Sequence, residues 1–132
     1  MLLDSKWIFK TSGGSEDLAT SGTTGVTSDY IDLKAVSGYA NGGGELTAVG
    51  RVKSTTAAAG ANFVVTLTDC DTSGGTYVAV GTKTVLLAAV VANTVMFEIP
   101  FPDDIRQFVK LTITPAASMT GALTVNAGVH VE

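Results

Sequence analysis

The sequence predicts an all-β protein, folded as a single-domain β-sandwich over residues 1–132. Apolar and polar residues alternate along several segments, and short glycine-rich turns separate these segments. Composition agrees: 15 glycines accompany many threonines and valines, whereas the residues that favour helices are scarce. About eight strands fit this pattern, and the long connections between some of them favour a jelly-roll-like arrangement.

Alternation locates the individual strands. Each predicted strand places its apolar side chains on one face, toward a shared core, and its polar side chains on the other. Two further segments are ambiguous: residues 84–91 fit either two helical turns or a strand, with the valines favouring a strand, and residues 102–106 fit one short helical turn. In chain order, the expected strands cover residues 7–10, 30–33, 46–53, 63–68, 77–80, 95–99, 109–114 and 123–131.

The charge content limits the classes of partner. Charged residues make up only 15% of the chain, against about 25% in a typical domain, so we expect part of the surface to be covered by another protein. The net charge is −4, and the eight basic residues are scattered along the sequence. Without a basic patch to neutralise phosphates, direct binding to nucleic acid is not expected, and the acidic balance argues against an anionic membrane surface.

Cysteine usage and the first residues indicate where the chain is made. Cys70 is the only cysteine, which rules out a disulfide within the chain. The first residues lack the basic and apolar regions of a signal peptide. The longest apolar run, residues 85–92, is far shorter than the ~20 residues that a membrane helix needs. We therefore expect synthesis in a reducing cytoplasm.

No catalytic, cofactor or metal site is predicted. The single histidine, His130, falls on the polar face of the last strand, where it is expected to be exposed. Cys70 lies between Asp69 and Asp71, and flanking carboxylates disfavour the thiolate that a nucleophile requires. One cysteine and one histidine cannot complete a zinc site. The aspartates at 103–104 have no surrounding calcium loop and fit turn chemistry instead.

The N-terminal segment is the candidate surface for protein contact. Leu2, Leu3, Trp7 and Phe9 bring large apolar side chains to a terminus that would otherwise fray. The alternative is that this segment forms the first strand of the core. A second candidate for an apolar contact outside the core is Phe108, which lies on the opposite face of its strand from the neighbouring apolar residues.

Five segments of the chain carry a resemblance to a known family. They are residues 1–4 followed by Trp7 and Phe9, residues 30–33 after a Thr/Ser-rich stretch, residues 95–100, residues 106–111, and the final Gly/Ala/Val strand. Together they resemble the capsid cement, or decoration, proteins of tailed bacteriophages. The resemblance implies a jelly-roll-like structural protein, not an enzyme, that binds the outer surface of the phage head across seams between major capsid protein subunits and stabilises the shell. It also implies self-association, with a homodimer favoured over a trimer, and a place on the virion exterior after synthesis in the host cytoplasm.

Two other functions compete with this interpretation. A carbohydrate- or receptor-binding sandwich from a virion fibre or adhesin would use exposed aromatic rings, for which Trp7, Tyr30, Tyr39 and Tyr77 are the candidates. A hydrolase built on a jelly roll would need converging carboxylates or a metal cluster, and the single histidine argues against it.

Overall fold

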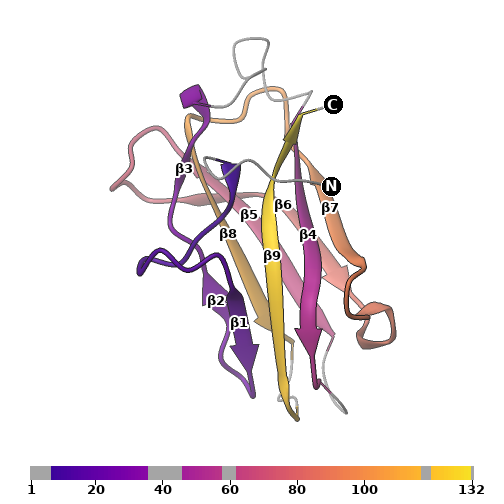
Figure 1. Cartoon of the computed structure of the whole chain (residues 1–132). Coiled ribbons are helices and arrows are strands. Elements are labelled where there is room, and N and C mark those ends of the chain that lie inside the picture. The colour runs from indigo at the N-terminus through magenta and orange to yellow at the C-terminus, as the bar shows by residue number, and fades with distance from the viewer. Residues whose placement is uncertain (1–6, 36–45, 58–61, 117–119, 132) are drawn as a thin grey trace.

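The computed structural model describes residues 7–35, 46–57, 62–116 and 120–131. These residues form nine strands in two antiparallel sheets that pack face to face, which confirms the predicted β-sandwich (Figure 1). The strands are β1 (Leu18–Ser21), β2 (Val26–Thr27), β3 (Ile31–Asp32), β4 (Leu46–Thr55), β5 (Phe63–Cys70), β6 (Val78–Val85), β7 (Val95–Pro100), β8 (Phe108–Pro115) and β9 (Ala122–Val131).

The connections between strands give the jelly-roll topology. The first sheet has the order β1-β9-β4-β7, and the second has the order β2-β8-β5-β6, with β3 also paired to β8. Apart from the β2–β3 and β5–β6 connections, each strand is followed along the chain by one in the opposite sheet. Because β2 and β3 pair with successive parts of β8, they act as one interrupted strand, which leaves the eight strand positions of a jelly roll.

Seven of the eight predicted strands are found, and two short ones were missed. The predicted strand over residues 7–10 is wrong: this segment forms only an isolated bridge, at Ile8. β1 and β2 lie in a turn-rich stretch and contain four and two residues, too few to show alternation. Of the ambiguous segments, the first continues β6 as far as Val85 and then forms a 3₁₀ helix at Leu87–Ala89. The second forms a β-turn in which the amide of Ile105 donates to the carbonyl of Pro102 at 3.1 Å.

The core lies between the two sheets and is built from alternate residues of the strands. Phe9, Phe63 and Phe97 are its largest fully buried side chains, and leucines, isoleucines and valines fill the space around them. The ring of Phe97 lies against Gly50, its partner in the β4–β7 pairing, at a point where the register shifts. A methyl group on Gly50 would overlap this ring, so only glycine allows the close approach.

A buried ion pair ties the end of β5 to the connection between β7 and β8. The carboxylate of Asp69 is buried and accepts hydrogen bonds from Nη2 of Arg106 at 2.7 Å, from its Nε at 2.9 Å and from its backbone amide at 3.0 Å. These bonds replace the water that Asp69 loses on folding. The side-chain hydrogen bond that Arg106 donates to Asp69 raises the pKa of Arg106, so the guanidinium keeps its charge. The pair therefore anchors the turn that precedes β8.

Replacing Gly50 with alanine should destabilise the sandwich by about 1–3 kcal/mol, the usual cost of overpacking a core. The free energy of unfolding from urea titrations measures this cost. Gly74 is the matched control, because its added methyl group would meet no atom within 4 Å. Equal stability of Gly50→Ala and Gly74→Ala would contradict the packing of Phe97 against Gly50.

Candidate functional site

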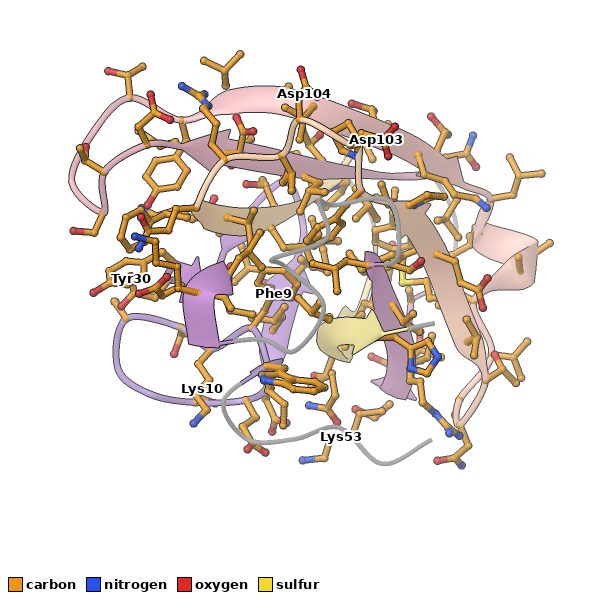
Figure 2. All side chains as sticks on the ribbon, turned by 90° about the horizontal axis from the view of Figure 1, so that it is seen from above. Phe9, Lys10, Tyr30, Lys53, Asp103 and Asp104 are labelled. Carbon is orange, nitrogen blue, oxygen red and sulfur yellow. The ribbon has the colours of Figure 1, made fainter. Side chains whose placement is uncertain are left out.

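The N-terminal segment belongs to the edge of the first sheet. Ile8 forms an antiparallel bridge with Gly128, and the amide of Phe9 donates to the carbonyl of Ala127 at 2.9 Å. The segment thus continues the β1 side of β9. Phe9 points inward and is fully buried among the core side chains, whereas Lys10 points away from the core (Figure 2). The prediction of Phe9 as a surface contact is therefore wrong, because strand alternation turns its ring into the core.

The other predicted contact residues have different outcomes. Trp7 is half-buried and packs against the core, so only part of its side chain faces outward. Leu2 and Leu3 lie outside the described residues, and their contact role stays a prediction. The alternative interpretation, in which the segment forms the first strand of the core, is confirmed only for the burial of Phe9, because the segment forms an isolated bridge and not a strand.

Replacing Phe9 with alanine should lower the free energy of unfolding by about 3–5 kcal/mol, because it removes a fully buried ring and leaves a cavity. The exposed Leu86 provides the control, and Leu86→Ala should change stability by no more than about 0.5 kcal/mol. Chemical denaturation of both variants measures the difference. If Phe9→Ala were as stable as the unmodified protein, the prediction of the N-terminal segment as a contact surface outside the core would be supported again.

The strongest candidate for a contact surface is the connection between β6 and β7 together with the first residue of β7, here called the apolar loop and defined as residues 86–95 (Figure 1). It carries three of the exposed large apolar side chains: Leu86, Val91 and Val95 are 59%, 53% and 46% exposed. No charged residue occurs between positions 84 and 97. Exposed apolar residues that cluster in this way mark sites of protein association.

Backbone hydrogen bonds hold the apolar loop in place. The amide of Val52 donates to the carbonyl of Thr94 at 2.9 Å, and the amide of Asn93 returns a bond to the carbonyl of Val52 at 2.8 Å. Nη2 of Arg51 also donates to the carbonyl of Asn93 at 2.9 Å. The buried side chain of Val90 fastens the loop to the core. A loop ordered before docking loses little conformational entropy when a partner binds.

The sequence contains one feature that points to the apolar loop, which is its lack of charged residues. Residues 85–92 form the longest apolar run, which is too short for a membrane helix and fits a strand or two helical turns. The complete lack of charge from position 84 to position 97 was the better indicator. Exposure could not be predicted, because an apolar run of this length also fits a buried strand.

The outer face of the second sheet carries a row of threonines that are paired across four neighbouring strands. Thr27 pairs with Thr112, Thr112 with Thr66, and Thr66 with Thr82. The hydroxyls of Thr27 and Thr112 lie 3.1 Å apart and share a hydrogen bond. We call this surface the threonine face. Its short, stiff, uncharged side chains can be covered by a partner at a small cost in entropy and desolvation.

Aromatic side chains gather at one end of the threonine face. The rings of Tyr30 and Phe108 meet edge to face with centroids 5.3 Å apart, and Nζ of Lys110 lies 4.5 Å from the centre of the Tyr77 ring. Burial raises the pKa of Tyr77 above its ordinary value of 10.0. Phe108 is half-buried and lies outside the core, as predicted. Tyr39 lies outside the described residues.

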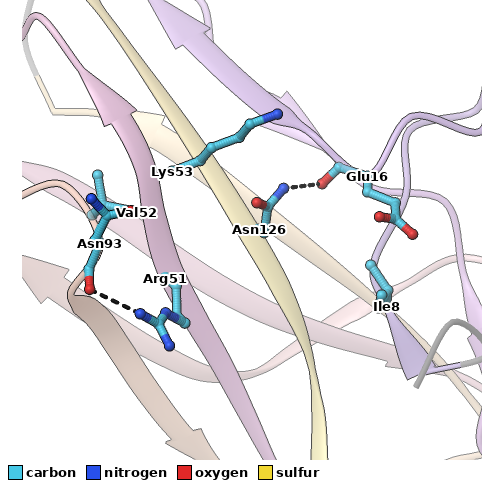
Figure 3. Close-up of a pocket in the computed structure, with 7 residues that line it drawn as sticks. All are labelled: Ile8, Glu16, Arg51, Val52, Lys53, Asn93 and Asn126. Carbon is cyan, nitrogen blue, oxygen red and sulfur yellow. Dashed lines mark hydrogen bonds between the residues drawn. The ribbon is translucent and has the colours of Figure 1, made fainter. Parts of the chain in front are cut away.

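A polar groove of about 330 Å³ lies on the outer face of the first sheet (Figure 3). Arg51 and Lys53 project outward from β4, two residues apart, and Asn126 stands opposite Arg51 on β9. Sequence alternation predicted the outward direction of these side chains but not that they would meet. The residues that line the groove are Ile8, Glu16, Arg51, Val52, Lys53, Asn93 and Asn126.

The two cations of the groove differ in their partners. Nζ of Lys53 lies 2.9 Å and 3.1 Å from the carboxylate oxygens of Asp17, and Nδ2 of Asn126 donates to the same carboxylate at 2.9 Å. The hydrogen bond from Lys53, followed by that from Asn126, lowers the pKa of Asp17. In the described part of the chain, Arg51 has no carboxylate within ion-pair distance.

The remaining titratable candidates lie apart. His130 is exposed, as predicted, and Cys70 is buried as the last residue of β5. Within the ranges that the structure describes, no group of three or more His, Cys, Asp or Glu side chains could hold a metal ion. None of the helices in the described residues is long and apolar enough to span a membrane.

Comparison with protein-family models and with curated proteins finds no match to this chain. The resemblance to capsid decoration proteins therefore rests on the residues of the chain itself.

Replacing Lys53 with glutamine should raise the pKa of Asp17 toward its ordinary value of 3.8, because the main hydrogen bond to the carboxylate is lost. Since the folded-state pKa is lowered, the pair contributes stability above the unfolded-state pKa and loses it as the pH falls through the folded-state pKa. An NMR titration of the Asp17 carboxyl in both proteins measures the shift. The same Asp17 pKa in both proteins would show that the ion pair does not form in solution.

Proposed function

We propose that the protein is a capsid decoration, or cement, protein that binds the outside of a tailed-phage head across seams between major capsid protein subunits. The observation that carries this proposal is the apolar loop: an ordered, charge-free segment whose Leu86, Val91 and Val95 side chains are about half exposed or more. A protein of this kind acts by docking and has no catalytic role.

The apolar loop supplies binding energy through burial. Covering the exposed part of each large apolar side chain contributes roughly 1 kcal/mol. No charge on the loop has to be desolvated, so this gain is not offset by the cost of removing water from an ion. The loop alone gives a weak contact, and we expect surrounding polar residues to complete an interface of ordinary size.

Stabilisation of the shell follows from mass action. A ligand that binds the assembled shell and not its free subunits shifts the equilibrium toward the shell. A protein that bridges a seam provides such selectivity, because both halves of its site are present only after assembly. Self-association, as a dimer in preference to a trimer, would raise the effective concentration at neighbouring seams. The threonine face offers a surface of short hydroxyl side chains for a second protein contact.

Replacing Val91 with serine should weaken binding to assembled shells by roughly fivefold, the equivalent of about 1 kcal/mol. Val78 provides a matched control, since it is also a valine with 53% exposure but lies at the start of β6, outside the apolar loop. Co-sedimentation with intact shells and with free capsid subunits measures the binding, and thermal unfolding checks that both variants fold.

Three outcomes would overturn the proposal. They are equal sedimentation with free subunits and shells, no sedimentation with shells, or equal weakening by Val91→Ser and Val78→Ser. Binding of the isolated protein to a glycan array without any binding to shells would favour the receptor-binding sandwich instead.

A further inference from the structure

We propose that the polar groove on the first sheet is a binding site for a sugar that bears a carboxylate, such as a uronic acid, with Arg51 as the residue that recognises the carboxylate. Binding of a sugar in this groove does not depend on the proposed docking to a shell. The two surfaces share one residue, Asn93, which belongs to both the groove and the apolar loop.

The charge of Arg51 is what selects a carboxylate. A guanidinium has five N–H donors. Among the described residues, the one hydrogen bond of the Arg51 guanidinium runs from Nη2 to the carbonyl of Asn93. Lys53, beside it, is already paired with Asp17. An incoming carboxylate can therefore form two parallel hydrogen bonds with Arg51, the geometry for which this side chain is suited.

The other groups of the groove suit hydroxyls. Nδ2 of Asn126 donates to the carbonyl of Glu16 and to Asp17, which fixes the amide and leaves its Oδ1 as an acceptor. The exposed carboxylate of Glu16 is a second acceptor. Ile8 provides an apolar contact for the C–H groups of a sugar ring. The groove thus combines one cation, two acceptors for hydroxyls and an apolar contact.

Charge and size disfavour other ligands. Lys53 is neutralised by Asp17 and Glu16 adds a negative charge to the lining, so a multiply charged anion such as phosphate would meet repulsion as well as the attraction of Arg51. The volume of about 330 Å³ lies at the lower end of the roughly 300–1,000 Å³ of ligand pockets. One or two sugar rings fit better than a longer chain.

The test is an NMR titration of the full ¹⁵N-labelled chain with sodium glucuronate, glucose, acetate and inorganic phosphate. Glucuronate should shift the signals of Arg51, Asn93 and Asn126, and it should bind roughly tenfold more tightly than glucose or acetate, because only glucuronate offers both a carboxylate and hydroxyls. Absence of these shifts, or binding of acetate or phosphate as tight as that of glucuronate, overturns the proposal.

Variants then assign the site. Arg51→Gln should weaken glucuronate binding by roughly tenfold or more, whereas Lys83→Gln, which removes an exposed cation on β6 outside the groove, should not change it. Unchanged binding by Arg51→Gln overturns the assignment. Because Arg51 also supports the apolar loop, the titration of the unmodified chain is the primary measurement. Val91→Ser separates the two proposals, since it should keep the glucuronate response and weaken shell binding.

Discussion

Successive side chains of a β-strand point to opposite faces of its sheet, and in this protein that alternation decides which residues can meet a partner. In β5 and β8, the inward set, which includes Val65 and Leu111, fills the core, whereas the outward set forms the threonine face. A slip of one residue in the pairing would bury the threonines and expose the core. The binding surfaces therefore depend on the same register that holds the two sheets together.

The edge beside the apolar loop is protected against pairing with other strands. β6 and β7 are the outermost strands of their sheets on this side. Lys83 pairs with Val65 and so places a charge on the inner side of the β6 edge, and Pro100 removes a backbone donor from β7. These features disfavour sheet extension between molecules. In the proposed function, association is left to the side chains of the loop.

The two outer faces of the sandwich differ in their chemistry. The first sheet presents charged and amide groups around a groove, and the second presents uncharged hydroxyls with aromatic rings at one end. A surface of the first kind suits a small polar ligand, because its donors and acceptors have fixed directions. A surface of the second kind suits a broad protein contact with little desolvation. The two proposals accordingly assign a protein contact and a small-molecule site to different faces of the domain.

The sequence by itself determined the all-β class, most of the strands and the outward direction of Arg51, Lys53 and Asn126, because alternation is a local property that can be read from neighbouring residues. Only the tertiary structure decided that Phe9 belongs to the core, that the run ending at residue 92 forms an exposed loop, and that β4 meets β9 to form the groove. Burial and the meeting of side chains depend on which distant segments pair. A sequence pattern does not specify those pairings, because many of them satisfy the same alternation.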